Sequence, residues 1–247
     1  MLIRRFVTAL RQQDWNTVLL ELVVVVAGIY LGMQANQWVE ERGLRRKEVE
    51  HLEALLIDFN KSVEDLKGAI DYKEHQIQDL QELLSKGTAA LGEERLDEII
   101  YRGVYSTNTY VPTLSALRDL ETSGNLSLIS DPEIRRGISE LRAKIDEVDR
   151  SFAEYLFFHQ NDLDSFIARH LPVVAFLSET SRAPVPSAVE EDWSALDTDL
   201  ARGLLAFKMS LARNYASGLE GLNKEFEQLS AAIAARVKDE TGNTSKQ

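Results

Sequence analysis

The sequence predicts an all-α protein in which an N-terminal transmembrane helix continues into an elongated, coiled-coil-like antiparallel three-helix bundle. Three observations support this prediction. An apolar stretch of membrane length lies near the N-terminus, and three long segments repeat apolar residues at alternating spacings of three and four. All five prolines lie at or beyond the ends of those segments, so the helices are not interrupted.

The composition favours a folded, acidic protein. The chain has 247 residues, of which 44% are hydrophobic and 28% are charged, which is too apolar for a chain disordered throughout. Its net charge of −12 repels nucleic acid, so we expect no nucleic-acid partner. The absence of cysteine excludes disulfides, thiol catalysis and thiolate metal sites.

The first 16 residues mix three arginines with apolar side chains. This pattern is typical of a segment that lies among lipid headgroups. A short frayed tail is the alternative.

The transmembrane helix is expected at residues 17–39. From Val18 to Met33 every residue except Glu21 is apolar, glycine or tyrosine. Twenty-two helical residues measure about 33 Å, close to the thickness of the hydrocarbon core. Trp15 and Trp38 bracket the stretch, as in an aromatic belt. The alternatives are a cleaved signal peptide and a buried core helix, but no small-x-small cleavage site follows the stretch.

Three residues of this span are candidate partner contacts. Gly28 and Gly32 form a small-xxx-small pair, which lets two spans approach closely. Glu21 is expected either near the membrane interface or in a polar contact with a partner span.

The extramembrane bundle is expected at residues 40–238, with its first rod at about 40–86. Ten of the eleven seam positions of this rod are apolar, and the exception is Lys73. The seam comprises Val49, Leu52, Leu56, Phe59, Val63, Leu66, Ile70, Lys73, Ile77, Leu80 and Leu84.

Residues 88–130 are expected to form a short helical cap at the far end of the first rod. One short helix is expected around residues 91–100 and another from Pro112 to Leu120. The second rod is expected at 131–170, with Asp131 as its N-cap, and the third at 194–238. Residues 239–247 are expected to be a disordered tail.

The sequence contains no recognisable catalytic, nucleotide-binding or metal-binding motif. The four histidines show no ligand spacing, and His159 falls on the apolar seam of the second rod, where we expect a hydrogen-bonded core histidine. No P-loop, dinucleotide fingerprint or Gly-x-Ser-x-Gly motif occurs. We therefore expect a protein that is not an enzyme and that uses no cofactor.

One compact region, residues 101–136, has the composition of a recognition surface, because it combines tyrosine, asparagine, arginine and glycine. The alternative is that these residues build turns, with Gly124 at a positive φ. The candidate contacts are Tyr101, Tyr105, Tyr110, Ser123, Gly124, Asn125, Asp131 and Arg135.

Two motifs carry a resemblance to a known family. One is the span from Glu21 to Trp38 (ELVVVVAGIYLGMQANQW), and the other is Leu-x-x-Leu-x-x-Ser-Gly-Asn-Leu-x-Leu-Ile-x-Asp from Leu117 to Asp131, followed by Arg135. In these motifs the chain resembles an uncharacterised family of bacterial single-span membrane proteins. The resemblance implies one N-terminal span in the inner membrane, a helical extramembrane domain and no assigned activity. It also implies a cytoplasmic N-terminus and a periplasmic bundle.

The expected function is an interaction or assembly module on a single membrane span, acting as a homo-oligomer or as an accessory subunit of a membrane complex. A second hypothesis is a sensory ectodomain that binds a small ligand between its helices and signals through a partner. A hydrolase with a site on its loops is a third.

Overall fold

The computed structural model describes residues 15–172 and 192–244, and within these ranges the regular structure is entirely helical. The predicted all-α fold is confirmed. Of the expected interfacial segment at residues 1–16, residues 1–14 lie outside the described residues, and α2 begins at Trp15. The chain divides into two units, residues 1–50 and 51–247, which are described separately below.

Helix α2 runs from Trp15 to Lys86 without a break, so the predicted continuity of the apolar stretch with the first seam is confirmed. In the first unit, every side chain from Leu22 to Val39 is exposed. This helix is long and apolar enough to cross a membrane.

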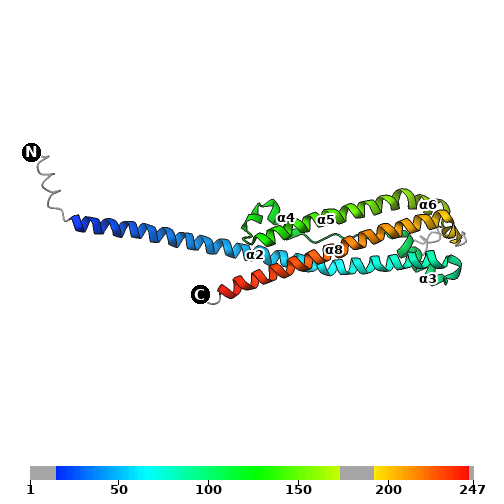
Figure 1. Cartoon of the computed structure of the whole chain (residues 1–247), viewed down its shortest axis with the longest axis horizontal. Helices are drawn as coiled ribbons and strands as arrows, with labels where there is room; N and C mark the ends of the chain where they lie inside the picture. The colour runs from blue at the N-terminus through cyan, green and yellow to red at the C-terminus, as the bar shows by residue number, and fades with distance from the viewer. Residues whose placement is uncertain (1–14, 173–191, 245–247) are drawn as a thin grey trace, which may run out of the picture. The chain divides into compact units, whose positions relative to one another are not determined.

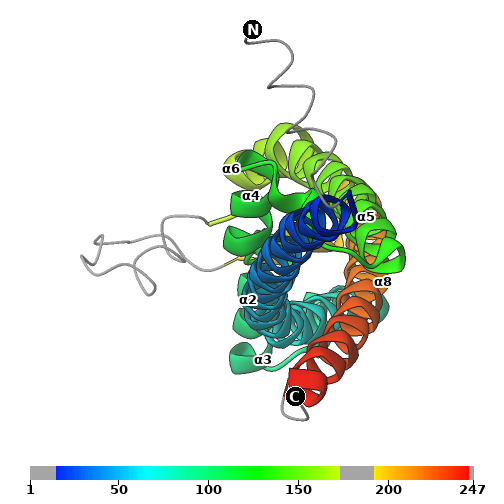
Figure 2. The same cartoon turned by 90° about the vertical axis from the view of Figure 1, so that its left-hand side faces the viewer.

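In the second unit, three long helices pack into a bundle: α2 from His51 onward, α5 (Pro132–Phe158) and α8 (Asp199–Thr244). Figure 1 shows that α5 runs in the same direction as this part of α2, whereas α8 runs in the opposite direction. The contacts of α8 agree, because Arg202 meets Leu84 near the end of α2 whereas Phe226 meets Phe59 farther back along it. Seen along their length (Figure 2), the three helices are separate rods and not a flat layer.

The expected antiparallel order of the first two rods is therefore wrong. The reason is the connection between the two rods. It runs back along α2, so that α5 begins at the same end of the bundle as α2. It contains η1 (Thr88–Ala90), α3 (Glu93–Ile99), the π-helical segment η2 (Ile100–Tyr105), an extended stretch, α4 (Ser115–Thr122) and η3 (Asn125–Leu128).

Polar residues of α2 mark the path of this connection. Tyr72 Oη donates to Ser106 Oγ at 2.6 Å, and farther back Asp58 accepts hydrogen bonds from Ser115 Oγ at 2.9 Å and from the Ala116 amide at 2.7 Å. Helix α4 thus lies beside the start of the bundle. The expectation that both short helices cap the far end is wrong for α4.

The second rod ends in an irregular turn. Asp131 caps α5 as predicted, since its carboxylate accepts from the amides of Glu133 and Ile134. After Phe158 the chain forms a π-helical segment, η4 (His159–Leu163), and then α6 (Asp164–His170). The third rod follows η5 (Ser194–Asp197) and continues to Thr244, so residues 239–244 are helical and not the disordered tail we expected.

The bundle core consists of two apolar clusters along the same three rods. The first includes Leu55, Phe59 and Phe226, and the second includes Leu80, Tyr155 and Leu205. The seam positions between them are partly polar, and these positions form the candidate site described below.

Alanine substitution at two glycines of the bundle tests the backbone conformation assigned to each. Gly124 lies in the left-handed region with φ +73°, whereas Gly68 is an exposed glycine inside helix α2. We expect Gly124→Ala to lower the free energy of unfolding by about 1–2 kcal/mol, because a Cβ disfavours this conformation. Gly68→Ala should raise it by about 0.5–1 kcal/mol, because alanine favours the helix.

Guanidinium unfolding of the detergent-solubilised full chain, followed by circular dichroism, measures both changes. Equal effects of the two substitutions would contradict the assigned turn.

Candidate functional site

The predicted recognition region does not form one surface. Tyr101 is exposed on η2, and Tyr105 packs against the second apolar cluster. Tyr110 is buried in the first cluster, where its hydroxyl donates to the Ser62 carbonyl at 3.2 Å. These three tyrosines therefore have different surroundings.

The Ser-Gly-Asn motif builds a turn, as the structural alternative proposed. Ser123 Oγ donates to the Asp119 carbonyl at 2.6 Å, Gly124 supplies the positive φ, and Asn125 begins η3. Arg135 donates to the carbonyls of Ile129 and Ser130, which fixes the entry into α5. These residues position backbone, so the structure gives them a local structural role.

The candidate contacts in the apolar helix are open. A Cβ added at Gly28 or Gly32 would meet no atom within 4 Å. The side chain of Glu21 lies outside the described residues.

A buried polar group lies between the two apolar clusters. We call it the central polar layer and define it by the side chains of Lys73, Gln76, Tyr155, His159 and Lys208, together with the backbone of Ser106. All three rods contribute to it. The five residues are at most 4% exposed.

Gln76 and the Ser106 carbonyl organise the layer. The Gln76 amide donates to the carbonyls of Arg102 at 2.6 Å and Ser106 at 2.9 Å. Tyr155 Oη lies 3.2 Å from Gln76 Oε1 and 3.1 Å from the Ser106 carbonyl oxygen. Helix α2, the connection and α5 are thus joined by one hydrogen-bond network.

Two lysines enter this network with little compensation for their charge. Lys73 Nζ donates to Gln76 Oε1 at 3.0 Å and lies 4.6 Å from the centre of the Tyr155 ring. Lys208 Nζ donates to the carbonyls of Val104 and Ser106. Among the described residues neither ammonium forms an ion pair, although buried charges are normally paired.

Burial changes the protonation of these lysines. Loss of hydration disfavours the charged form, which lowers the pKa of Lys73 to about 8. The pKa of Lys208 is lowered well below its ordinary value, first by burial and then by the charge of Lys73, while Asp164 opposes the shift.

His159 completes the layer from η4. Its Nε2 lies 3.2 Å from an Asp164 carboxylate oxygen, whereas its Nδ1 is buried and has no hydrogen-bond partner in the part of the chain that the structure describes. Burial and the two lysine charges lower the pKa of His159 to about 3. The expectation of a core histidine therefore holds for its burial, but among the described residues only one of its nitrogens has a partner.

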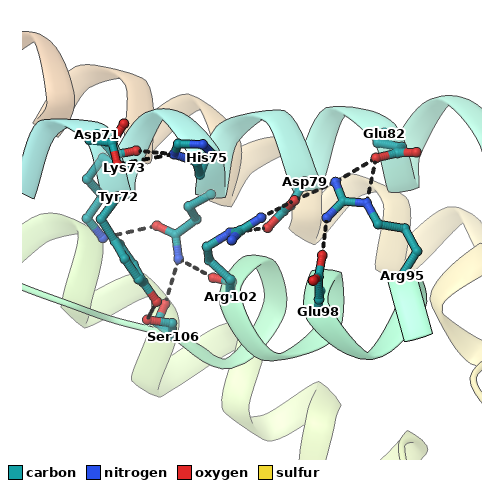
Figure 3. Close-up of polar contacts among 11 residues, drawn as sticks. Asp71, Tyr72, Lys73, His75, Asp79, Glu82, Arg95, Glu98, Arg102 and Ser106 are labelled. Atoms are coloured by element: carbon teal, nitrogen blue, oxygen red, sulfur yellow. Dashed lines mark hydrogen bonds and ion pairs between the residues drawn. The ribbon is translucent and has the colours of Figure 1, made fainter. Parts of the chain in front are cut away.

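A second polar cluster lies beside the layer, on the side of α3. Figure 3 shows the Asp79 carboxylate between Arg95 and Arg102. Arg102 Nη2 donates to Asp79 Oδ1 at 2.9 Å and Arg95 Nη2 at 2.8 Å, and Arg95 also pairs with Glu82. Because Asp79 is already paired, this cluster is a clamp of α3 and η2 onto α2 and is not a counter-charge for the lysines.

Part of the central polar layer could be recognised from the sequence. Lys73 is the polar exception on the first seam, and His159 lies on the second. Lys208 falls three residues after Leu205 and four before Ala212, so it lies on the buried seam of α8. Gln76 lies three residues after Lys73, and our seam had placed Ile77 there instead.

We expect Lys73→Met to raise the free energy of unfolding at pH 7 by roughly 1–3 kcal/mol, because it replaces a buried ammonium with an apolar chain of similar length. Gln76 Oε1 keeps Tyr155 as a partner, so no acceptor is left alone.

The wild-type chain should also gain stability as the pH rises from about 8 toward 10. In this interval the folded state binds fewer protons than the unfolded state, because the folded pKa of Lys73 is lowered to about 8. Lys208 acts with the same sign. The gain should be smaller in Lys73→Met, as measured by guanidinium unfolding at a series of pH values. A variant less stable than wild type at pH 7, with an unchanged pH dependence, would contradict this account.

Comparison with models of protein families, with curated proteins and with solved structures found no match. The resemblance to bacterial single-span proteins therefore stays a prediction carried by its two motifs.

Proposed function

We propose that this chain is a single-span membrane protein whose helical bundle serves as an interaction or assembly module, either in a homo-oligomer or as an accessory subunit of a membrane complex. The observation that supports the proposal best is the apolar surface of α2. Its large apolar side chains between Leu20 and Val39 are 54–66% exposed. Contiguous apolar surface of this kind marks a membrane or protein contact.

A bilayer is the environment that suits this segment on all sides. The exposed apolar residues occur around the whole helix and not on one stripe, which is the pattern of a helix surrounded by lipid. Its backbone groups are paired within the helix, as a hydrocarbon environment requires.

The assembly part of the proposal follows from where apolar surface is already used. The seams of the three rods are buried against one another in the two core clusters. Partner contacts therefore belong elsewhere, and the open face at Gly28 and Gly32 is the strongest candidate for close contact between spans.

We propose the bacterial inner membrane as the location, with the bundle in the periplasm. This part of the proposal rests on the resemblance of the span and of the Ser-Gly-Asn motif. A reporter fused to the C-terminus, active only on one side of the membrane, tests it.

The membrane proposal predicts the effect of charge in the apolar segment. The wild-type chain should remain with membranes during alkaline carbonate extraction. The double substitution Val24→Arg and Val26→Arg should move most of it to the soluble fraction, since each central arginine costs about 2.5–3.5 kcal/mol on insertion. Val111→Arg is the matched control, because Val111 is 76% exposed in the bundle. Equal release of both variants would contradict a span at this position.

The assembly proposal predicts the effect of bulk at the glycines. Gly28→Ile with Gly32→Ile should reduce crosslinked species in native membranes several-fold, because branched side chains keep the spans apart. Gly43→Ile is the matched control, since Gly43 is an exposed helical glycine outside the predicted span. Crosslinking followed by mass spectrometry identifies the partners. If the wild-type chain is found only as an isolated monomer, the assembly proposal is wrong.

A further inference from the structure

The central polar layer contains two buried lysines that have no buried counter-charge among the described residues. Lys73 is 1% exposed and Lys208 is 0% exposed, and neither forms an ion pair within the described ranges. The charge of Asp164 reaches Lys208, but this carboxylate pairs with His159 and its side chain is 49% exposed. Asp79 already forms ion pairs with Arg95 and Arg102. Among the described residues, the two lysines thus share the layer without a buried carboxylate of their own.

The layer also has more hydrogen-bond donors than acceptors. An ammonium group has three N–H donors, yet Lys73 has one hydrogen-bond acceptor among the described residues, Gln76 Oε1. The carbonyl oxygen of Ser106 has two lone pairs but lies within 3.2 Å of three donors, on Gln76, Tyr155 and Lys208. An acceptor-rich group is what such a layer lacks.

His159 supplies a second and independent indication. Its side chain is 6% exposed, its Nε2 lies 3.2 Å from Asp164, and its buried Nδ1 has no hydrogen-bond partner among the described residues. With the proton on Nε2, Nδ1 is an acceptor and requires a donor. A buried polar atom without a partner is costly, so it calls for an explanation such as a functional role or a bound water or ion.

We propose that the central polar layer binds a small oxyanion, of the carboxylate or phosphate kind, between Lys73 and Lys208. The anion balances the charge of the two lysines and accepts hydrogen bonds from their unused N–H groups. Hydrogen phosphate also has an O–H group that can donate a hydrogen bond to His159 Nδ1, whereas an ionised carboxylate has no such donor.

The backbone around the layer supports this assignment. The π-helical segments η2 and η4 both lie at the layer, since η2 carries the Val104 carbonyl and η4 begins with His159. Segments of this type frequently occur at functional sites, because the wider turn displaces side chains from the regular seam. This proposal agrees with the second hypothesis from the sequence, a domain that binds a small ligand between its helices. It is independent of the membrane-assembly proposal.

The test is isothermal titration calorimetry of the detergent-solubilised full chain with sodium acetate and with sodium phosphate, at constant ionic strength and pH 7. We expect saturable binding of at least one of them. Lys208→Met and Lys73→Met should each weaken binding at least tenfold. Lys238→Met is the matched control, because Lys238 is an exposed lysine on the same helix as Lys208 and should leave binding unchanged.

The two kinds of anion are distinguished by His159→Phe. This variant should weaken the binding of phosphate but not that of acetate, because only phosphate donates to Nδ1. Circular dichroism confirms that each variant is folded. The absence of saturable binding of both anions overturns the proposal, and so does an equal affinity in wild type and Lys208→Met. Neither result affects the carbonate-extraction or crosslinking experiments.

Discussion

The bundle depends on the way in which polar residues of α2 hold the returning connection. Asp58 binds the start of α4, Ser62 binds the backbone of Thr113, and Gln76 binds the carbonyls of Arg102 and Ser106. Asp79 adds two arginines of α3 and η2. Because these groups are buried, each must be paired, and the pairing allows one path of the connection along α2. That path returns the chain to the start of the bundle and makes α5 parallel to α2.

The central polar layer divides the core at one level and has structural consequences of its own. A polar pair in an otherwise apolar seam fixes the register of neighbouring helices, because a shifted register leaves its groups unpaired. Gln76 and Tyr155 meet this description, since their hydrogen bonds to each other and to the carbonyls of the connection join different elements. Lys73 and Lys208 do not need to be charged for this purpose. A glutamine or a tyrosine would fix the register with less loss of hydration free energy, so register alone does not account for two buried lysines.

The sequence predicted the helices and their approximate ends because local signals determine both. The alternation of threes and fours found the rods, and Asp131 followed by Pro132 marked the start of α5. The direction of α5 was not predictable in this way, because it depends on contacts between residues more than 40 positions apart, such as Ser62 with Thr113. For the same reason, only part of the central polar layer could be predicted from the sequence. A lysine on a seam is a local signal, whereas the convergence of Lys73 and Lys208 on Tyr155 appears only when three rods are assembled.

The two unusual features of the chain differ in what they leave unsatisfied. The apolar part of α2 has a paired backbone and exposed apolar side chains, so it lacks apolar contact, and lipid or another span is the proposed source of that contact. The central polar layer has ample apolar contact above and below it and a deficit of negative charge. A partner helix that repairs the first deficit does nothing for the second, because the lysines are enclosed by the chain's own rods. The two features therefore call for different ligands, and a membrane contact and a small anion can be gained or lost independently.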